Sequence, residues 1–404
     1  MIPQLNRTVK NIPEALSISV NQIVYHKKNQ GERVYTFSLG EAYFDIPRFE
    51  ISDNSFKRGY HYSSSMGQPN LRKCIADLYF GHYGVSVDPD NEILISAGSK
   101  PIIYMLMQAV LNRGDEVIVH EPAWLSYKEQ IKLVGGIHIP IPYYKEVFEW
   151  EQYFTDKTKL IIINNPNNPS GQLYSYEEME HLLFLAKKYN LFVLSDEAYS
   201  DFLISDDKFI SFATLDSNKE HCLVVNSLSK NMGMSGWRVG YAIGHSEVIK
   251  QLLKLNQHLI TCAPTMFQDY MAEHFEEILK VTIPQAVKMA EKRKKVQAIM
   301  DRVGIRALKG VGTFYFLVDV SKFKGTTEEL VYDLLINHNI ATVPGHAYGE
   351  STKDFIRFGI GVETLEDIEF CLKKIKELLD KLEYDNSNIR KQMEQHGIVS
   401  IYGE

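Results

Sequence analysis

Lys230 stands where a lysine is unusual, shortly after the apolar run at residues 222–225. Burying an unpaired ammonium group is costly, so a lysine held at the end of a buried strand is a candidate for a lowered pKa and for an amine nucleophile. Ser227 and Ser229 precede it and Arg238 follows it, so the same segment offers groups that bind a phosphate. The alternative is a strand-end lysine that reaches solvent beside a glycine-rich turn, and this segment alone leaves both interpretations open.

A carboxylate follows another apolar run. Residues 191–195 predict a buried strand, and Asp196 and Tyr199 follow it, where the ligands of open α/β sheets collect. The acidic strand end of an ATPase has a similar pattern, but the sequence has no Gly-Lys dipeptide for a phosphate-binding loop and no G-x-G-x-x-G segment. Nucleotide hydrolysis and dinucleotide binding therefore lose most of their support. A carboxylate that pairs with a pyridine nitrogen fits a pyridoxal cofactor anchored on a lysine.

Three turns between predicted elements carry further candidates. Gly98, Ser99 and Lys100 stand between a strand and an apolar helical run, where the backbone N–H groups of a helix start favour an anion such as phosphate. Trp124 follows another strand end and offers a face for a flat ring. Asn168 lies in a turn rich in asparagine and proline. Each has a structural alternative: an ordinary helix start, a core tryptophan and an ordinary turn.

Alternating strands and helices must position these groups. Amphipathic segments separate short apolar runs, and one of them begins with a capping box from Ser175 to Glu178. The alternation predicts an α/β fold with a mainly parallel sheet. Runs rich in isoleucine and valine predict buried strands at residues 93–96, 116–120, 160–164, 191–195 and 223–226.

The pattern changes after Pro284, which predicts a second, smaller lobe with a boundary near residue 290. A long charged helix is expected up to about residue 303, then a strand at 313–320, a capped helix from Thr326 and a last helix from Thr364. The tail at residues 384–404 is polar and irregular, and its composition fits either a strap or a disordered end.

Composition and charge exclude several classes of protein. The net charge is −7 and the pI about 6.0, so the field of the whole protein would repel a nucleic acid. A basic run at residues 292–295 is the local exception, and its apolar neighbours at helical spacing predict a solvated helix face. The four cysteines stand far apart without a cluster at metal-ligand spacing, so no metal site is expected. With no signal peptide and no membrane-spanning stretch evident, we expect a cytoplasmic enzyme that makes no contact with a membrane.

Together, these segments resemble the class I and II aminotransferases, which are pyridoxal-phosphate enzymes of fold type I. The most specific segment is S-x-S-K followed by G-W-R-x-G-Y, from Ser227 to Tyr241. The N-N-P-S-G and S-D-E-A-Y segments support it by their order and their placement between strands. The likeness is greatest to the bacterial-type aspartate aminotransferases, and it extends from Leu16 to the predicted strand around Arg357.

The resemblance implies two domains and a cofactor, pyridoxal 5′-phosphate. The large domain would span residues 46–290 around a mainly parallel, seven-stranded sheet, and a smaller α+β domain would combine residues 1–45 with 291–404. Lys230 would form a Schiff base with the cofactor, and Asp196 would keep its pyridine nitrogen protonated.

Further contacts to the cofactor follow from the same resemblance. Tyr199 and Asn168 would hydrogen-bond the oxygen on the ring, and Trp124 would stack on the ring. The family's tyrosine five residues before the glycine of G-x-P-x-L-R matches Tyr62, which would reach the phosphate in the neighbouring subunit and so implies a homodimer with shared sites. Around the phosphate, the matching residues are Gly98, Ser99, Ser227 and Arg238, and Lys100 is also expected at the cofactor site.

The substrates implied are an amino acid and a 2-oxo acid, which would react in two half-reactions. Arg357 matches the arginine that binds the substrate α-carboxylate, a bidentate task for which lysine is poorly suited. Gly40 would contact the same carboxylate through its backbone, and Trp124 and Asn168 would also line the substrate site. Lys230 would move a proton from Cα as general base and acid.

Departures from the family pattern fall near the expected place of the substrate side chain. The usual G-E-P-D-F reads G-E-A-Y-F at residues 40–44, the tyrosine that commonly precedes the stacking tryptophan is Ala123, and the segment between Pro47 and Tyr62 is a few residues short. Lys100 lies where bacterial-type aspartate aminotransferases place a lysine near the distal carboxylate. It hints at an acidic substrate or at glutamate as donor, although relatives of other specificity share it.

Two other functions compete with transamination. The same motifs serve β-lyases, decarboxylases and cyclopropane-forming synthases, so the motifs leave the outcome of the reaction open. A ligand-sensing transcription regulator built on this fold would carry a DNA-binding segment ahead of it. About forty residues precede Gly40, and the overall charge is acidic, so we disfavour that function.

Overall fold

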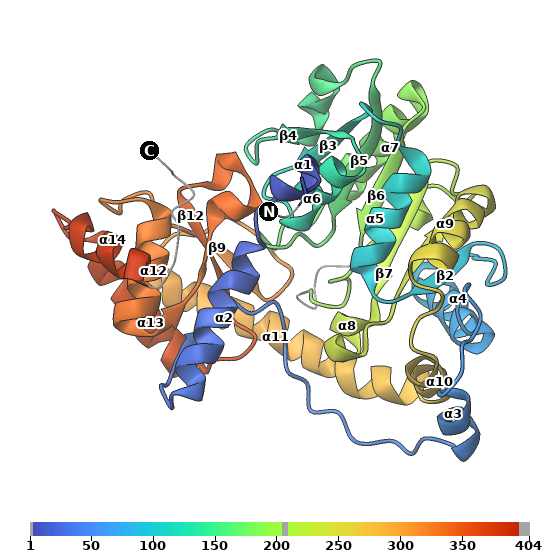
Figure 1. Ribbon diagram of the computed structural model, residues 1–404, viewed down its shortest axis with the longest axis horizontal. Helices are drawn as coiled ribbons and strands as arrows, with labels where there is room; N and C mark the ends of the chain where they lie inside the picture. Colours follow the sequence, from blue (N-terminus) through green and yellow to red (C-terminus); the bar gives the residue numbers. More distant parts are fainter. Residues whose placement is uncertain (1–2, 204–208, 396–404) are drawn as a thin grey trace.

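A seven-stranded sheet forms the centre of the larger part of the molecule (Figure 1), in a computed structural model that describes residues 3–203 and 209–395. Strand β8 runs antiparallel to both of its neighbours, while the remaining pairs in the sheet are parallel. The predicted α/β fold with a mainly parallel sheet is therefore confirmed. In spatial order the strands are β2 (Ile93–Ser96), β8 (Gly240–Gly244), β7 (Cys222–Ser227), β6 (Phe192–Asp196), β5 (Thr158–Asn164), β3 (Glu116–His120) and β4 (Ile137–Ile141).

The strands predicted from apolar runs lie within two residues of their observed bounds, and two strands of this sheet, β4 and β8, were missed. Strand β4 lies at the edge of the sheet, where the half-buried His138 and the exposed Pro140 interrupt the apolar run. Strand β8 begins and ends with the glycines Gly240 and Gly244, which are uncommon inside strands. Both strands depend on their neighbours for pairing, which a local pattern does not report.

Two hydrophobic cores cover the two faces of the sheet. In β5, Ile161 and Ile163 belong to one core and Leu160 and Ile162 to the other, because successive side chains of a strand point to opposite faces. The first core contains residues of α4 (Pro69–Tyr83), α7 (Tyr176–Tyr189) and α10 (Thr265–Glu273). The second contains residues of α5 (Ser99–Val110), α6 (Ser126–Leu133) and α9 (Ser246–Leu259).

A third core combines residues from both ends of the chain. Phe37 packs there with the antiparallel sheet of β11 (Val343–Pro344), β12 (Phe355–Gly359) and β9 (Tyr315–Asp319). The short strands β1 (Tyr35–Thr36) and β10 (Ile340–Ala341) pair beside it. Figure 1 shows the long helix α11 (Phe275–Val303) running from α10 to this core. The predicted domain boundary near residue 290 lies within α11, and the division into two domains stays a prediction.

The helices of this part differ in places from the expectation. Helix α11 begins at Phe275 and continues through Pro284, although a proline inside a helix costs about 3 kcal/mol. Ile278 and Ala286, on either side of the proline, are fully buried and hold the helix in place. The basic run at residues 292–295 is a solvated face only in part: Lys294 and Lys295 are exposed, whereas the side chain of Arg293 is buried at 2% exposure.

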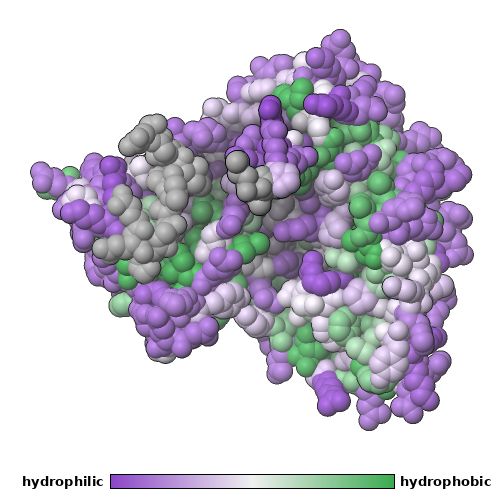
Figure 2. Space-filling model, in the orientation of Figure 1, coloured by the Kyte–Doolittle hydropathy of each residue, from purple (hydrophilic) through white to green (hydrophobic). Residues whose placement is uncertain are grey.

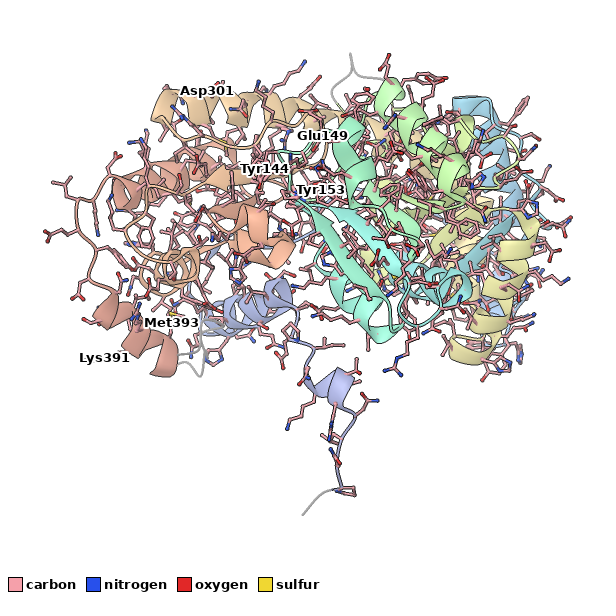
Figure 3. The ribbon with its side chains drawn as sticks, turned by 90° about the horizontal axis from the view of Figure 1, so that it is seen from above. Tyr144, Glu149, Tyr153, Asp301, Lys391 and Met393 are labelled. Atoms are coloured by element: carbon pink, nitrogen blue, oxygen red, sulfur yellow. The ribbon has the colours of Figure 1, made fainter. Side chains whose placement is uncertain are left out.

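The C-terminal segment adds a helix that was not expected. The predicted caps are confirmed, since Ser175, Thr326 and Thr364 cap α7, α12 (Thr327–His338) and α13 (Leu365–Leu379). Helix α14 (Asn386–Gln395) follows and packs its buried Ile389 against α12. Figure 3 shows it, marked by Lys391 and Met393, at one end of the molecule. Part of the tail predicted as irregular is thus helical, and residues 396–404 lie outside the described residues.

Among the described residues, three helices precede α4 in the sequence: α1 (Arg7–Lys10), α2 (Leu16–Asn29) and α3 (Asp53–Arg58). The face of the molecule in Figure 2 is mostly hydrophilic, with scattered hydrophobic patches. Within residues 3–203 and 209–395, no helix has the length and apolar character needed to cross a bilayer. All four cysteines are free thiols.

Candidate active site

The candidate residues of the sheet come together because neighbouring strands end at the same edge. Asn164, Asp196 and Ser227 are the last residues of β5, β6 and β7, which pair side by side. Lys230 follows β7 on the short helix α8 (Leu228–Asn231). Parallel strands bring residues that are far apart in the sequence to one carboxyl edge, which is where α/β sheets bind their ligands.

A cavity of about 300 Å³ opens at this edge. Two of the predicted site residues, Gly98 and Tyr62, do not line it. Gly98 lies directly behind the lining, since a Cβ atom built on it would be 2.5 Å from Nη2 of Arg238. The predicted residues that line the cavity are Gly40, Ser99, Lys100, Trp124, Asn168, Asp196, Tyr199, Ser227, Lys230, Arg238 and Arg357.

Lys230 has the environment expected of an amine nucleophile. Burial lowers the pKa of its ammonium group to about 8, and the positive charges of Arg357 and Arg238 act in the same direction. Its Nζ donates a hydrogen bond to the carbonyl oxygen of Gly40 and lies 5.7 Å from the centre of the Tyr199 ring. A lysine with a lowered pKa carries a larger share of neutral amine near neutral pH, so Lys230 is suited to act as a nucleophile or a base.

Asp196 is buried, and the protein supplies a partner to each of its oxygen atoms. Tyr127 donates a hydrogen bond of 2.6 Å to Oδ2, and the backbone N–H of Ala198 donates one of 3.2 Å to Oδ1. Burial nevertheless raises the pKa of Asp196 to about 6. A cationic partner in the cavity would favour the ionised carboxylate.

Tyr127 was missed by the sequence analysis, although a signal for it existed. It lies on α6, three residues after Trp124, and the two rings are in contact with their centres 5.2 Å apart. Trp124 stands just ahead of the helix, and the backbone N–H of Tyr127 donates a hydrogen bond of 3.0 Å to its carbonyl oxygen, so the turn into α6 brings the two rings together. Tyr127 therefore links the wall that carries Trp124 to the carboxylate at the end of β6.

Tyr199 joins residues from distant parts of the chain. Its hydroxyl accepts a hydrogen bond of 3.2 Å from Nδ2 of Asn168 and lies 3.2 Å from the hydroxyl of Tyr315. The side-chain oxygen of Asn168 is buried without a hydrogen-bond partner among the described residues, so it has an acceptor free for a ligand. Tyr315 was also missed, because nothing in the apolar run of β9 distinguishes it from a core residue.

Arg357 is a buried cation at another wall of the cavity. It lies on β12, with its guanidinium 4.8 Å from the ring centre of Tyr315 and 5.3 Å from that of Tyr348. Nη2 donates a hydrogen bond of 2.6 Å to the carbonyl oxygen of Ser38, while Nε has no partner in the described part of the chain. Within the described residues, no carboxylate forms an ion pair with Arg357. A buried guanidinium group of this kind is suited to bind a carboxylate ligand.

A second cationic group gathers where α5 begins. Ser99 is the first residue of this helix, and Arg238 faces the preceding Gly98, whose φ of 92° suits glycine. Partial burial, and next the charge of Arg238, lower the pKa of Lys100. The ammonium group of Lys100 lies 5.1 Å from the centre of the Trp124 ring. Backbone N–H groups at the start of α5, together with these cations, are suited to bind an anion.

A second chamber of about 320 Å³ adjoins the cavity and shares Trp124 and Leu125 with it. Ala123 and Tyr348 also line this chamber, as does the segment at residues 12–16 ahead of α2. A larger side chain at residue 123 would enter this space. The sequence analysis noted the small residue at 123 but had no means of predicting the chamber.

Known proteins resemble this chain over most of its length. The family model of aminotransferase class I and II matches residues 46–375. The aspartate aminotransferase of Bacillus sp. (strain YM-2) is 32% identical over 90% of this chain and 96% of its own length. A probable aspartate/prephenate aminotransferase of Aquifex aeolicus is 30% identical over 93% of this chain and 98% of its own length. The solved structure of Thermus thermophilus aspartate aminotransferase with maleate has a TM-score of 0.82 at 27% identity, covering 93% of this chain and 98% of that chain.

Proposed function

The chain belongs to the class I and II aminotransferases, and from that premise we propose that Lys230 anchors pyridoxal phosphate, that the amino donor is an acidic amino acid, and that the enzyme is a homodimer. It transfers an amino group between an amino acid and a 2-oxo acid. One observation carries the proposal. A single cavity unites the amine of Lys230, whose pKa is lowered to about 8, with the carboxylate of Asp196 and the guanidinium groups of Arg238 and Arg357.

Polar groups of the cavity that lack partners fit pyridoxal phosphate. The buried side-chain oxygens of Asn168 and Ser229 have no hydrogen-bond partner among the described residues, and they suit the polar substituents of a bound ring. When bound, the cofactor supplies an aldehyde carbon that accepts the amino group and a ring that takes up the charge released at Cα. The residues that would hold it are Gly98, Ser99, Ser227 and Arg238 at the phosphate, Asp196 at the ring nitrogen, Asn168 and Tyr199 at the ring oxygen, and Trp124 at the ring face.

Lys230 is the group that moves the proton. In its neutral form, Nζ removes the proton from Cα of the amino acid, and the resulting ammonium group then acts as the acid. The lowered pKa keeps both forms accessible near neutral pH, which an ordinary lysine does not achieve. The carbonyl oxygen of Gly40 accepts a hydrogen bond from Nζ and so limits the directions in which the amine points.

Asp196 holds a proton on the ring nitrogen by remaining an anion beside it. The hydrogen bonds from Tyr127 and from the N–H of Ala198 favour the ionised carboxylate. Because the site is buried, this charge acts in a medium of low dielectric and is worth more than it would be in water. Asp196 thereby lowers the energy of the charge that develops when Cα loses its proton.

Arg357 would bind the α-carboxylate of the substrate. Its Nη2 is held by the carbonyl oxygen of Ser38, which fixes the plane of the guanidinium group, and its unpartnered Nε is available to a ligand. A planar guanidinium binds a carboxylate through two parallel hydrogen bonds, so Arg357 would set both the position and the orientation of the amino acid.

The side chain of the substrate has two candidate sites, which favour different amino acids. Lys100 offers a cation in the same cavity as Lys230, which favours a second carboxylate and hence aspartate or glutamate. The second chamber beside Trp124 favours a larger apolar side chain, because the small Ala123 leaves that space open. We propose the acidic substrate as the main one, since its anchor lines the cavity itself, and a bulky apolar amino acid as the second candidate.

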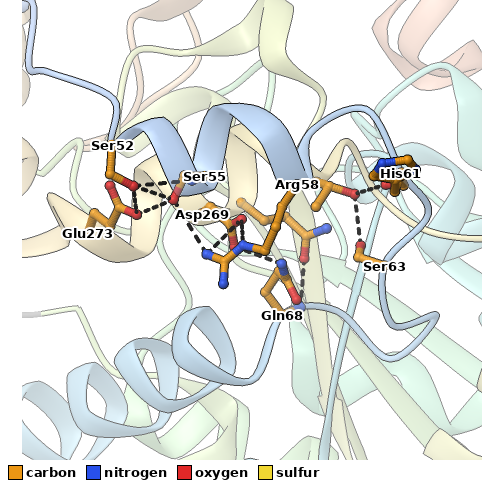
Figure 4. Close-up of polar contacts among 10 residues, drawn as sticks. Ser52, Ser55, Arg58, His61, Ser63, Gln68, Asp269 and Glu273 are labelled. Atoms are coloured by element: carbon orange, nitrogen blue, oxygen red, sulfur yellow. Dashed lines mark hydrogen bonds and ion pairs between the residues drawn. The ribbon is translucent and has the colours of Figure 1, made fainter.

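Tyr62 supports the proposed homodimer. Its side chain is 87% exposed, and that of the neighbouring Tyr60 is 71% exposed. The loop that carries them is nevertheless anchored, since the hydroxyl of Thr265 of α10 donates a hydrogen bond of 3.1 Å to the carbonyl oxygen of His61 and lies 3.0 Å from the hydroxyl of Ser63 (Figure 4). Aromatic side chains on an anchored, exposed loop suit an interface, and in this proposal Tyr62 completes the phosphate site of the neighbouring subunit.

Polar contacts between α3 and α10 hold the same region (Figure 4). Arg58 donates a hydrogen bond of 3.2 Å to Asp269, and Gln68 donates one of 2.7 Å to the other oxygen of that carboxylate. Ser52 donates one of 3.1 Å to Glu273. The loop between α3 and α4 is therefore tied at both ends, which fixes the direction in which Tyr62 leaves the subunit.

A half-reaction tests the proposed function. The purified enzyme, loaded with pyridoxal phosphate, is mixed with single amino acids in the absence of any 2-oxo acid. We expect aspartate and glutamate to convert the cofactor to pyridoxamine phosphate, which changes its absorbance. Release of pyruvate with ammonia, or of carbon dioxide, would instead identify a β-lyase or a decarboxylase and overturn the assignment of the reaction. Elution as a monomer in size-exclusion chromatography at micromolar concentration would contradict the homodimer.

A further inference from the structure

Arg293 is a buried cation outside the cavity that connects three segments of the chain. It lies on α11 and donates hydrogen bonds to three backbone carbonyl oxygens: through Nε to Gly310 at 3.2 Å, through Nη2 to Ser170 at 3.1 Å, and through Nη1 to Tyr315. Its guanidinium group also lies 4.0 Å from the ring centre of Phe316. The planar fork of an arginine can serve three acceptors at once, which a lysine ammonium does less well.

The charge of Arg293 is balanced by carbonyl dipoles rather than by a carboxylate. None of the ion pairs found among the described residues involves it, and burial is the cause that lowers its pKa to about 9. A buried, unpaired cation is costly, and an apolar side chain of similar size would fill the space more cheaply. The position of this side chain is therefore best explained by the segments that it joins.

These segments belong to different walls of the active site. Ser170 is two residues from Asn168, whose side chain bonds to Tyr199. Tyr315 begins β9, and its hydroxyl lies 3.2 Å from that of Tyr199. The next strand, β12, carries Arg357, whose guanidinium lies over the Tyr315 ring. Arg293 thus holds the loop on the cofactor side and the strand on the substrate side through one planar group.

Glycines allow the two segments to approach this closely. A Cβ atom on Gly171 would lie 2.4 Å from the carbonyl oxygen of Gly312 and 2.8 Å from Nη2 of Arg293. One on Gly310 would lie 2.3 Å from the carbonyl oxygen of Ser170. The backbone N–H groups of residues 311 and 312 both donate hydrogen bonds of 2.8 Å to the carbonyl oxygen of Gly171. The junction leaves no room for a shift of one segment without the other.

We propose that Arg293 is a positioning residue, which sets the place of the carboxylate-binding Arg357 relative to the Asn168–Tyr199 pair by holding the carbonyl groups of Ser170 and Tyr315. This inference rests on the proposed function, because it assigns Arg357 to the substrate and Asn168 with Tyr199 to the cofactor. Without Arg293, the two walls lose their common anchor. The affinity of Arg357 for a carboxylate ligand and the hydrogen bonds from Asn168 and Tyr199 to the cofactor ring are then expected to change together.

The test uses holoenzyme variants and a ligand that does not react. In Arg293→Met and Arg293→Lys, we measure the Kd of maleate, a dicarboxylic acid without an amino group, and the pH midpoint of the bound cofactor's absorbance. For Arg293→Met we expect the Kd to rise roughly tenfold, because small displacements of a binding group have large effects, and the midpoint to move by about half a unit. Arg293→Lys keeps the charge but not the planar fork, and should lie between the wild type and Arg293→Met.

Lys219 provides a control for the loss of a buried cation away from the site. It is 2% exposed, and it bonds to the carbonyl oxygens of Ser86 at 3.2 Å and Ser217 at 3.0 Å. Unlike Arg293, it also pairs with a carboxylate, that of Glu92 at 3.1 Å. It lies before the start of β7 and so at the sheet edge opposite to the site. Lys219→Met should lower the Tm. It should nevertheless leave the Kd of maleate within about twofold of the wild-type value, and the pH midpoint of the absorbance within about 0.1 pH unit.

The outcomes separate positioning from plain stabilisation. Arg293 variants that lose Tm while both the Kd and the midpoint match those of Lys219→Met would overturn the proposal. If Arg293→Met does not fold, Arg293→Lys decides by the same two quantities. Failure of the proposed function is visible separately. In that case none of the amino acids tested would convert the cofactor of the wild-type enzyme to pyridoxamine phosphate, whatever the variants do.

Discussion

Two walls of the cavity are constructed in different ways. The wall with Lys230 and Asp196 comes from short segments at the ends of adjacent strands, and these two ionisable side chains are hydrogen-bonded within the protein. The wall with Arg357 and Gly40 comes from segments more than 300 residues apart in the sequence, and the Nε atom of Arg357 lacks a partner among the described residues. The first wall suits fixed chemistry, whereas the second has groups left over for a variable ligand.

The comparison implies that changes in the first wall abolish turnover or stability, while changes in the second alter affinity and choice of substrate. This difference follows from where hydrogen bonds are already made. A group bonded on all sides in the protein has a structural or electrostatic role, and a buried polar group without a partner is an open position for a ligand.

The largest effect is expected at Lys230. Replacing Lys230 by alanine removes the base, so kcat should fall by roughly 10⁴-fold, measured in the half-reaction with glutamate. Added methylamine should restore part of the rate, since a small amine can enter the space left by the side chain. Retention of the full rate in this variant would place the proton transfer elsewhere. Lys219→Met serves as the control for general damage.

A pH-dependent loss of stability is expected from Glu197, which lies beneath the first wall. Burial raises the pKa of this carboxyl group to about 7 from an ordinary value of 4.5. Because the folded state favours the protonated form, its contribution to stability is present at acidic pH and is lost as the pH rises through about 7. The ionisation of Glu197 alone should thus lower the free energy of unfolding by about 3 kcal/mol between low and high pH.

Glu197→Gln tests this assignment, since glutamine keeps the shape but does not titrate. The amide oxygen of glutamine can keep the hydrogen bond from the N–H of Phe212 at 2.8 Å, and the hydroxyl of Ser211, which donates to the other oxygen at 2.7 Å, can rotate to accept from the amide NH₂ group. Urea unfolding of the apoenzyme from pH 4.5 to pH 8 should show a smaller slope with pH for the variant than for the wild type. Identical slopes would mean that another group carries the dependence.

At the second wall, Arg357→Lys should weaken binding more than it slows chemistry. A lysine cannot form the two parallel hydrogen bonds to a carboxylate, so we expect KM for the amino donor to rise by about 100-fold with a much smaller change in kcat. Steady-state kinetics with glutamate measure both. A drop in kcat at unchanged KM would move Arg357 to the group of residues that act on the reaction itself.

The smallest effect, a change in preference, is expected at the rim of the second wall. Lys100→Ala should reduce kcat/KM for aspartate and glutamate by about fivefold to tenfold and leave leucine and phenylalanine nearly unchanged, since one partly exposed ion pair is worth about 1 kcal/mol. Ala123→Tyr should have the opposite pattern, because its ring would fill the second chamber. Equal effects of both variants on all four amino acids would contradict the two proposed side-chain sites.

The first wall was also the more predictable one. Lys230, Asp196 and Asn168 follow apolar runs that predict strands, and parallel strands place such residues at one edge whatever the details of packing. In contrast, Arg357 and Gly40 were connected to the site by resemblance to a family, since neither one's local sequence carries a sign of its role. The antiparallel strand β8, edge strand β4 and helix α14 were likewise missed, because each is stabilised by neighbours distant in sequence.

The sequence by itself determined the alternation of strands and helices, the caps of α7, α12 and α13, and the order of the motifs, because these depend on residues within a few positions of one another. Only the tertiary structure decided that Tyr127 bonds to Asp196, that the basic run on α11 buries Arg293, and that a second chamber lies beside Ala123. These features depend on which side chains meet across the core, and such meetings are set by the packing of whole elements rather than by local pattern.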